Sequence, residues 1–365
     1  MKLPHFERFR PICPVCRRRG RESLLELRTV IREAESDVLE GILVCSEPAC
    51  MAEYPVIDGI PVILADMRDF IARNASAILS RTDLSETLES LVGDCCGPHS
   101  EFDLRRQHLG SYAFDHYGDL DPEEPADGPA RPGSILRLLR EGLSRLGAPP
   151  VGPVLDAGCA TGRTSFELAA ATDDLVMGAD LNFDMLRTAS RVLREGTVRY
   201  PRRRIGMVHD RREFPAVFPA ADRVDFWACD ATAIPLASRC FGLAVSLNLL
   251  DCVIGPADHL REIGRVLAPG GRAILCTPYD WSPNATPVES WIGGHSQRSE
   301  HRGAAEPMLR RLLAGGDGFG DIHELRLLSE FAFPWTVRVH DRGRMEYEAH
   351  LTILEKNPTD GKEET

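Results

Sequence analysis

From residue 151 onward, short apolar runs alternate with longer stretches whose apolar residues recur at helical spacing. The runs at 151–155, 175–179, 224–228, 242–248 and 273–277 predict buried strands. The stretches at 163–171, 183–193 and 257–267 predict helices packed on those strands. Strands and helices that alternate in this way favour right-handed crossovers. The pattern therefore predicts an α/β fold with a doubly wound, mostly parallel sheet.

Acidic residues follow three of the predicted strands. Asp156 opens the turn Asp156-Ala157-Gly158-Cys159-Ala160-Thr161-Gly162, and such a turn brings backbone N–H groups to a ligand at a helix N-terminus. Asp180 lies where a carboxylate can accept both ribose hydroxyls, although it could instead cap the next helix. Asp230 is placed to accept the adenine amino group. These acids predict one nucleotide-like ligand across the carboxyl edge of the sheet, and the turn alone would also fit a dinucleotide.

The first 66 residues form a different pattern, with two close cysteine pairs around a strand-like stretch. The pairs are Cys13 with Cys16 and Cys45 with Cys50. Short loops that each supply two thiolates suit tetrahedral zinc, and four sulfur ligands leave the metal no open position. We therefore predict a structural zinc site, the alternative being four buried cysteines packed as small apolar residues. Asp58-Gly59 between two β-branched runs predicts a hairpin over 53–64.

Residues 67–129 connect this module to the larger α/β domain, which we expect to span 130–356 before a disordered tail at 357–365. Apolar residues at helical spacing predict a helical linker that ends in an aromatic-rich segment. Its members Tyr112, Phe114, His116 and Tyr117 are second-tier substrate candidates, since such a stripe is also typical of packing. Cys95-Cys96 is expected to be a loop pair without function.

The composition of the chain limits the number of domains, the partners and the cellular location that we expect. The chain has 365 residues, which suits one large domain plus a small one, and a formal net charge of -12, which argues against a surface built mainly for nucleic acid. Its 11 cysteines mostly lie singly in apolar runs, unlike a disulfide framework. No apolar stretch approaches the ~20 residues that cross a bilayer, and no leader-like segment opens the chain, so we expect a cytoplasmic protein without membrane partners.

The ordered motifs resemble the class I S-adenosylmethionine-dependent methyltransferase superfamily over some 130 residues. They are the turn from Asp156 to Gly162, Asp180, Asp230 and the Pro269-Gly270-Gly271 turn. The resemblance implies a seven-stranded Rossmann-like sheet with S-adenosylmethionine as cofactor. Ala160 stands where the family usually has a glycine. The cofactor-binding residues it implies are Asp156, Gly158, Ala160, Gly162, Asp180, Leu181, Asp230, Ala231 and Asn248.

Finer segments resemble the methyltransferase domain of ovothiol biosynthesis, which methylates an imidazole nitrogen of a thiolated histidine. They include 114–118, 155–168, 196–200, 248–251, 278–281 and 333–338. This implies N-methylation of a small, histidine-derived imidazole or amine. Candidates for holding that nucleophile are Tyr279, Asp280, His116 and Tyr117, with Trp281 and Asn248 nearby, and each could instead be structural. No strong general base is needed if the nucleophile is neutral, because methyl transfer depends on approach geometry.

The N-terminal module resembles the small zinc-ribbon-like activators of methyltransferases that act on tRNA, rRNA and release factors. The similarity lies in Cys13-Pro14-Val15-Cys16, the second cysteine pair and the segment 54–64. It implies a docking module fused to its enzyme and a protein partner bound through it. An RNA or protein methyltransferase is therefore an alternative function, and a binding protein that catalyses nothing is a third.

Eight arginines lie between residues 191 and 212. Such a cluster could grip RNA or an anionic substrate. Because aromatic stacking partners are nearly absent beside it, we favour a solvated, poorly ordered loop over 195–222. The arginines are Arg191, Arg194, Arg199, Arg202, Arg203, Arg204, Arg211 and Arg212.

Overall fold

The structure is a computed structural model that describes residues 1–35, 37–80, 82–125, 131–315 and 322–358. The expected first residue of the catalytic domain, at 130, lies outside the described residues. So does 359–365, which makes up most of the expected tail.

One mixed sheet forms the centre of the molecule, in the order β1-β2-β3-β4-β9-β6-β5-β10-β11-β13-β12. Every pair from β4 to β11 is parallel, and the remaining pairs are antiparallel. The strands of this sheet are β1 (Leu25–Ala34), β2 (Asp37–Cys45), β3 (Glu53–Ile57), β4 (Ile60–Ile63), β5 (Val154–Ala157), β6 (Val176–Asp180), β9 (Val224–Cys229), β10 (Phe241–Leu247), β11 (Leu267–Thr277), β12 (Leu325–His340) and β13 (Gly343–Lys356).

Helices cover both faces of this sheet, as expected for a doubly wound fold. Buried side chains of α5, α6, α7 and α8 join one apolar core, and those of α9 and α10 join the other. The helices are α1 (Leu3–Phe9), α2 (Pro14–Arg17), α3 (Met67–Leu79), α4 (Glu86–Cys96), α5 (Glu101–Tyr117), α6 (Ser134–Ser144), α7 (Arg163–Ala171), α8 (Phe183–Glu195), α9 (Pro256–Val266) and α10 (Ala305–Ala314). The predicted mostly parallel α/β sheet is confirmed.

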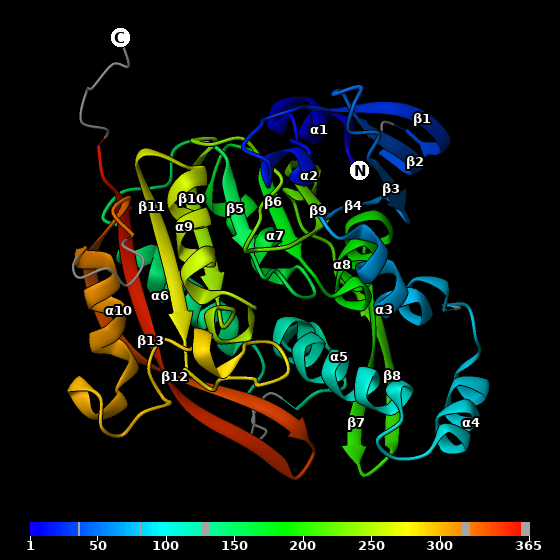
Figure 1. Cartoon of the computed structure of the whole chain (residues 1–365). Coiled ribbons are helices and arrows are strands. Elements are labelled where there is room, and N and C mark those ends of the chain that lie inside the picture. The colour runs from blue at the N-terminus through cyan, green and yellow to red at the C-terminus, as the bar shows by residue number, and fades with distance from the viewer. Residues whose placement is uncertain (36, 81, 126–130, 316–321, 359–365) are drawn as a thin grey trace.

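The sheet has eleven strands, and the seven-strand expectation describes only those after residue 150. The predicted hairpin at 53–64 is present as β3 and β4, with Asp58 and Gly59 at φ 52° and 74° in its turn. Strand β4 then pairs in parallel with β9, joining Val62 to Ala228. The N-terminal strands therefore extend the catalytic sheet at one end, while the β12–β13 hairpin closes the other (Figure 1).

The prediction of a poorly ordered loop at 195–222 is wrong. Strands β7 (Thr197–Ile205) and β8 (Val208–Pro215) form a second, two-stranded sheet. Val198, Tyr200 and Phe214 are buried on it, while its arginines face acidic residues of other elements. Salt bridges and a small apolar face thus replace the solvent contacts that we expected for the charged residues.

The described part of 67–125 contains the three helices α3, α4 and α5, as expected of a helical linker. Helix α3 begins after Asp66, whose carboxylate accepts the Asp69 N–H at 3.1 Å, and α5 begins after Ser100, whose hydroxyl accepts the Asp103 N–H at 3.2 Å. Helix α5 packs against β7 and β12 and so lies over the carboxyl end of the sheet. None of the helices in the described ranges is both long and apolar enough to cross a membrane.

Candidate active site

The turn between β5 and α7 is built on a buried carboxylate. Asp156 accepts hydrogen bonds from the hydroxyls of Thr164 and Ser165, both at 2.6 Å, and so fastens the first turn of α7 to the strand. Burial raises the pKa of Asp156 to about 6, although the two hydroxyls oppose that shift. This predicted cofactor-binding residue therefore shapes the turn from beneath.

Left-handed backbone explains the residue types of this turn. Gly158, Ala160 and Gly162 have φ of 77°, 47° and 88°. A Cβ at Gly162 would lie 2.6 Å from the Phe226 ring and 2.7 Å from Ala189, so only glycine fits there. Ala160 adopts the left-handed region at a cost of ~1 kcal/mol, which accounts for the family's usual glycine.

Asp180 lies beside the same turn, at the end of β6. One carboxylate oxygen accepts the Ala160 N–H and the other accepts the Asn182 N–H, each at 2.8 Å. Burial raises the pKa of Asp180. Asn182, rather than Asp180, caps α8, because its side chain accepts from Asp184 and Met185. Leu181 between them is about half exposed.

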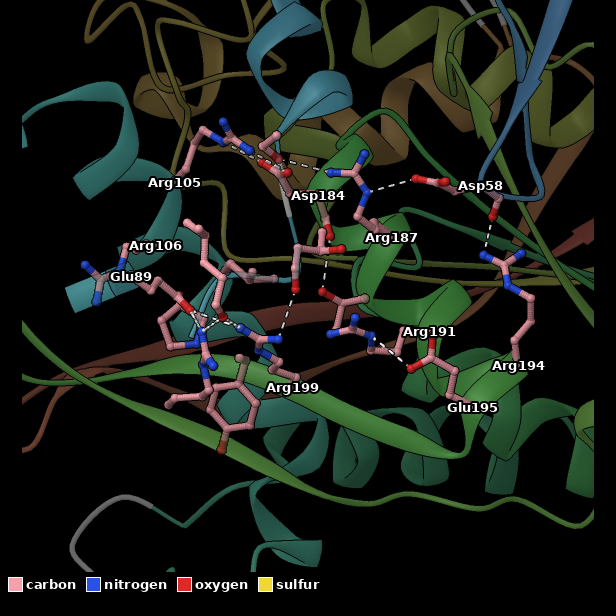
Figure 2. Close-up of a pocket in the computed structure, with 18 of the residues that line it drawn as sticks. Asp58, Glu89, Arg105, Arg106, Asp184, Arg187, Arg191, Arg194, Glu195 and Arg199 are labelled. Atoms are coloured by element: carbon pink, nitrogen blue, oxygen red, sulfur yellow. Dashed lines mark hydrogen bonds and ion pairs between the residues drawn. The ribbon is translucent and has the colours of Figure 1, made fainter. Parts of the chain in front are cut away.

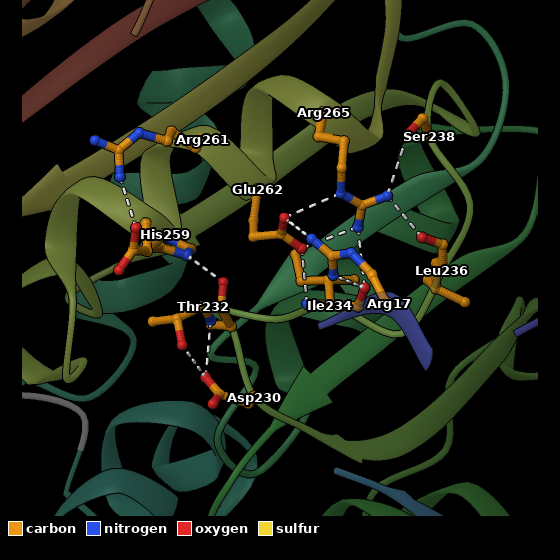
Figure 3. A network of polar contacts seen from close by, with 12 residues as sticks. Arg17, Asp230, Thr232, Ile234, Leu236, Ser238, His259, Arg261, Glu262 and Arg265 are labelled. Carbon is orange, nitrogen blue, oxygen red and sulfur yellow. Dashed lines mark hydrogen bonds and ion pairs between the residues drawn. The ribbon is translucent and has the colours of Figure 1, made fainter. Parts of the chain in front are cut away.

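A third segment, 230–236, follows β9. Asp230 accepts the Thr232 N–H at 2.8 Å and hydroxyl at 2.7 Å, and the Ala231 carbonyl contacts His259 Nδ1 at 3.0 Å. The other nitrogen of His259 contacts the Ser246 hydroxyl at 2.8 Å. Figure 3 shows this network continuing to the N-terminal module.

That continuation runs through the cysteine knuckle. Arg17, next to Cys16, donates to the Ile234 carbonyl at 2.8 Å and forms an ion pair with the buried Glu262. Glu262 in turn accepts the Ile234 N–H at 2.9 Å and pairs with Arg265. The knuckle thus directly contacts the segment that carries Asp230 and Ala231.

A cavity of about 140 Å³ opens beside the glycine turn. Its walls come from the turn, the end of α5, the end of β10 and the β12–β13 hairpin. Asn248 lines it with φ 54°, and both polar atoms of its amide are buried without a hydrogen-bond partner among the described residues. The lining residues are Ser111, Tyr112, Asp115, His116, Ile135, Asp156, Gly158, Ala160, Thr164, Leu247, Asn248, Trp335, Val337 and Tyr347.

The four predicted catalytic residues are placed differently. His116 lines the cavity, and its Nδ1 accepts the Arg163 N–H at 3.3 Å. Burial, followed by the Arg163 charge, lowers the pKa of His116 to about 3, so the ring is neutral with its proton on Nε2. Tyr117 is fully buried and donates to the Thr161 carbonyl at 2.7 Å, which supports the turn.

Tyr279 and Asp280 lie outside the cavity lining. The Tyr279 hydroxyl contacts His350 Nδ1 at 2.8 Å, away from the glycine turn. Asp280 accepts the Tyr347 hydroxyl at 2.8 Å, and Tyr347 lines the cavity. Asp280 therefore reaches the site through one intervening side chain.

Sequence reasoning missed Tyr347 and Trp335 as lining residues. Their rings stack 5.3 Å apart on the β12–β13 hairpin, and the Trp335 Nε1 is buried without a partner among the described residues. The segment 333–338 carried a signal, because it belongs to the finer resemblance. Asp115 was also missed as a site residue. It caps α6 by accepting the N–H groups of Ser134 at 2.7 Å and Ile135 at 2.9 Å.

The four N-terminal cysteines converge as predicted, with all ligand atoms within 4.8 Å of one another. The sulfurs of Cys13 and Cys50 are 3.7 Å apart, as are those of Cys16 and Cys45. A tetrahedral site with Zn–S bonds of about 2.3 Å has edges of about 3.8 Å. The cysteine geometry therefore fits one tetrahedral zinc ion.

Comparison with known proteins supports the cofactor assignment. Residues 155–275 match the family model of a methyltransferase domain. The demethylmenaquinone methyltransferase of Clavibacter sepedonicus is 32% identical over 142 residues, which cover 38% of this chain and 47% of that protein. A ubiquinone/menaquinone biosynthesis C-methyltransferase of Syntrophotalea carbinolica is 28% identical over 151 residues, which cover 39% and 54%. The chain thus spans about half the length of these relatives.

Among solved structures, a [4+2]-cyclase aligns with 69% of this chain and 96% of its own, at 14% identity and a TM-score of 0.41. The match at 155–275, the fold and the glycine turn all agree with a methyltransferase domain of the class I, S-adenosylmethionine-dependent type. The unpartnered amide of Asn248 and the tight turn around Gly162 fit the amino acid part of that cofactor.

Proposed function

We propose that this protein transfers a methyl group from S-adenosylmethionine to a nitrogen of a small molecule, an imidazole or amine derived from histidine. The carrying observation is the 140 Å³ cavity between the glycine turn and the β12–β13 hairpin. Its volume is below the range of about 300–1,000 Å³ of drug-sized ligand sites, which suits one small ring. Aromatic walls from Tyr112, Trp335 and Tyr347 suit a planar group.

For the cofactor, the turn from Gly158 to Gly162 would hold the amino acid part, Asp180 the ribose and Asp230 the adenine amino group. S-adenosylmethionine bound there supplies a methyl group on a sulfonium sulfur. The chain's own contribution is to place the acceptor nitrogen in line with the sulfur–methyl bond and to exclude water from the cavity.

Three cavity residues would orient the acceptor. The Asn248 amide has a donor group and an acceptor atom that the protein leaves unused, so one can contact the cofactor while the other contacts the methyl acceptor. His116 is held neutral and presents an N–H. Tyr347 keeps its ring in the cavity wall because its hydroxyl donates to Asp280. A neutral nitrogen acceptor needs no stronger base than these groups supply.

The test is mass spectrometry of the products after incubation with labelled S-adenosylmethionine and, in parallel, 5-thiohistidine, histidine and total RNA. We expect label in thiohistidine or histidine. Asp180→Ala should lose that label and weaken S-adenosylhomocysteine binding by about tenfold or more, since a charged hydrogen bond contributes about 1.5–3 kcal/mol. Asp173→Asn, at a fully exposed aspartate, is the matched control.

Other outcomes would redirect the assignment. Label in RNA alone would support the RNA methyltransferase alternative, against which the ion-paired arginines of β7 and β8 now count. Failure of the wild-type protein to bind S-adenosylhomocysteine would favour the binding protein that catalyses nothing.

We further propose that Cys13, Cys16, Cys45 and Cys50 hold one structural zinc ion. Metal analysis should give one zinc per chain, and Cys45→Ser should lower that content and the melting temperature. Cys95→Ser, at an exposed cysteine outside the cluster, should change neither. The same module remains our proposed docking surface for a protein partner, with β1 as its exposed edge.

A further inference from the structure

A second and larger cavity, of about 390 Å³, lies apart from the cofactor site and shares no lining residue with it. Its walls are the end of α3 and the segment before α4, the first half of α5, helix α8, and the β7–β8 hairpin. Arg32, Leu39 and Asp58 of the N-terminal module complete it. Figure 2 shows arginines of α5 and α8 around this space.

The lining is strongly cationic, because eight arginines face four carboxylates. Several of the arginines are bound within the protein and hold the walls together. Arg105 pairs with Asp184 at 2.6 Å, Arg187 with Asp58 at 3.2 Å, and Arg191 with Glu195 at 3.2 Å. Arg199 and Arg211 share Glu89. These pairs fix the positions of the cavity walls before any ligand arrives.

Two further arginines have no carboxylate oxygen within 4.0 Å among the described residues. The guanidinium of Arg106 lies 5.2 Å from the centre of the Phe102 ring, and its buried Nε has no hydrogen-bond partner there. Arg194 donates to the Asp58 carbonyl. Burial lowers the pKa of both side chains, with nearby acids opposing the shift. Arg194 is exposed, whereas Arg106 is half-buried, and a half-buried cation without a bound anion is unfavourable, so the surroundings of Arg106 favour an anionic ligand.

We propose that this cavity binds a small phosphate-bearing ligand of about nucleotide size, whose phosphate is held by Arg106. The planar fork of a guanidinium matches two phosphate oxygens at once. A volume of about 390 Å³ falls within the range of small-molecule sites. Phe102, Leu84 and Leu109 supply an apolar wall for the uncharged part of the ligand.

An RNA strand fits this surface less well. Beyond the cavity, the hairpin arginines that could continue a phosphate track are already used by the protein. Arg202 pairs with Glu124 at 2.8 Å, and Arg212 pairs with Asp121 and Glu123. A strand would have to displace these carboxylates, whereas a small ligand inside the cavity would not.

Calorimetric titration of the full-length protein tests the proposal with inorganic pyrophosphate, adenosine diphosphate and adenosine as probes. Ionic strength is held constant with sodium chloride, and saturating S-adenosylhomocysteine blocks the adenine site. We expect pyrophosphate and the diphosphate to bind and adenosine not to bind. Arg106→Gln should weaken binding about tenfold, the effect of one lost charged hydrogen bond. Arg140→Gln, at an exposed arginine on α6, should leave it unchanged.

Absence of pyrophosphate and diphosphate binding to the wild-type protein would overturn the proposal. So would equal affinities of the wild type, Arg106→Gln and Arg140→Gln, or adenosine binding as tightly as the diphosphate. A 20-nucleotide RNA that binds through Arg106 while pyrophosphate does not would replace the small ligand with nucleic acid. Unchanged S-adenosylhomocysteine affinity in the variants shows that they are folded, and pyrophosphate binding is read independently of methyl transfer.

Discussion

Asn248 is the residue whose chemistry is least explained by the protein itself. Its amide is buried and unpartnered, and its backbone is left-handed. We expect Asn248→Ala to lower kcat/KM for the methyl acceptor at least about tenfold. Its free energy of unfolding should change by less than ~1 kcal/mol, because removing an unsatisfied amide offsets the strain of alanine at positive φ.

The matched control for that variant is Arg239→Ala. Arg239 is exposed, has φ 63° and lies outside the cavity, so this variant adds the same backbone strain without touching the site. Its kcat/KM should equal that of the wild type. Steady-state kinetics and urea unfolding of both variants supply the measurements, and equal losses of activity in the two would show that backbone strain is responsible.

His116 should make the stability of the folded protein depend on pH. Its pKa is lowered to about 3 in the folded protein, against an ordinary value of 6.5. Below pH 6.5 the unfolded chain binds a proton that the folded chain refuses, so stability falls as pH falls from about 6.5 toward 3. The loss from this group is about 1.4 kcal/mol per pH unit.

Comparison with His116→Asn isolates that contribution, since asparagine keeps an acceptor for the Arg163 N–H. The stability of the wild type relative to the variant should fall by about 1 kcal/mol between pH 6.5 and 5.5, less than the full value of about 1.4 kcal/mol per unit because the unfolded histidine is half protonated at pH 6.5. Urea unfolding at both values measures it. For the control His295→Asn, at an exposed histidine, the free energy of unfolding should change with pH as it does in the wild type. The same pH dependence in His116→Asn would disprove the role assigned to His116.

Among the elements, the knuckle of α2 and the segment 230–236 form one unit. Arg17→Ala removes a hydrogen bond to Ile234 and an ion pair with Glu262, which retains Arg265. We expect about tenfold weaker S-adenosylhomocysteine binding and faster amide exchange over 231–236, with zinc content unchanged. Arg18→Ala, one residue further along, is exposed and should have no effect. Weaker binding without faster amide exchange over 231–236 would show that Arg17 does not act through this segment.

The elements also show what sequence alone could supply. Strands β5, β6, β9 and β10 were predictable because each is a short apolar run followed by turn-forming residues. Helices α7, α8 and α9 were predictable because their apolar residues recur at helical spacing. The β7–β8 hairpin carried the alternation Val198, Tyr200 and Phe214, but the intervening arginines suggested solvent. Their acidic partners Glu89, Asp121 and Glu124 lie in α4 and the loop after α5, and no local pattern links them.

Some residues of the candidate site were likewise predictable from the sequence, and others were not. Asp156, Gly158, Ala160 and Asn248 reach the cavity because they follow strands whose ends share one edge. Tyr347 and Trp335 come from a hairpin about 90 residues after the last of these, so their approach depends on the tertiary packing of β13 against β11. Side-chain direction was equally hidden: Tyr279 and Tyr117 were chosen by position but bond away from the cavity.

At the scale of the whole molecule, the proposed zinc and cofactor sites lie on elements of one sheet. We expect a chelator to lower the melting temperature of the entire chain in a single transition, since β4 cannot loosen without exposing β9. Tryptophan fluorescence, to which the buried Trp227 of β9 contributes, should report the same midpoint as far-ultraviolet circular dichroism. The chelator preloaded with zinc is the control, and two separated midpoints would mean that the module unfolds independently.

Strand β4 is synthesised well before β9, the strand with which it pairs. Val62 leaves the ribosome about 165 residues before its partner Ala228. At about 5–20 residues per second, that interval is roughly 8–30 s. For this time the edge of β4 that faces β9 has no partner, and open strand edges invite association between chains. A zinc ion bound early by the four cysteines, as we propose, would keep the nascent module compact until β9 is made, and we therefore expect the yield of folded protein to depend on zinc supply during translation.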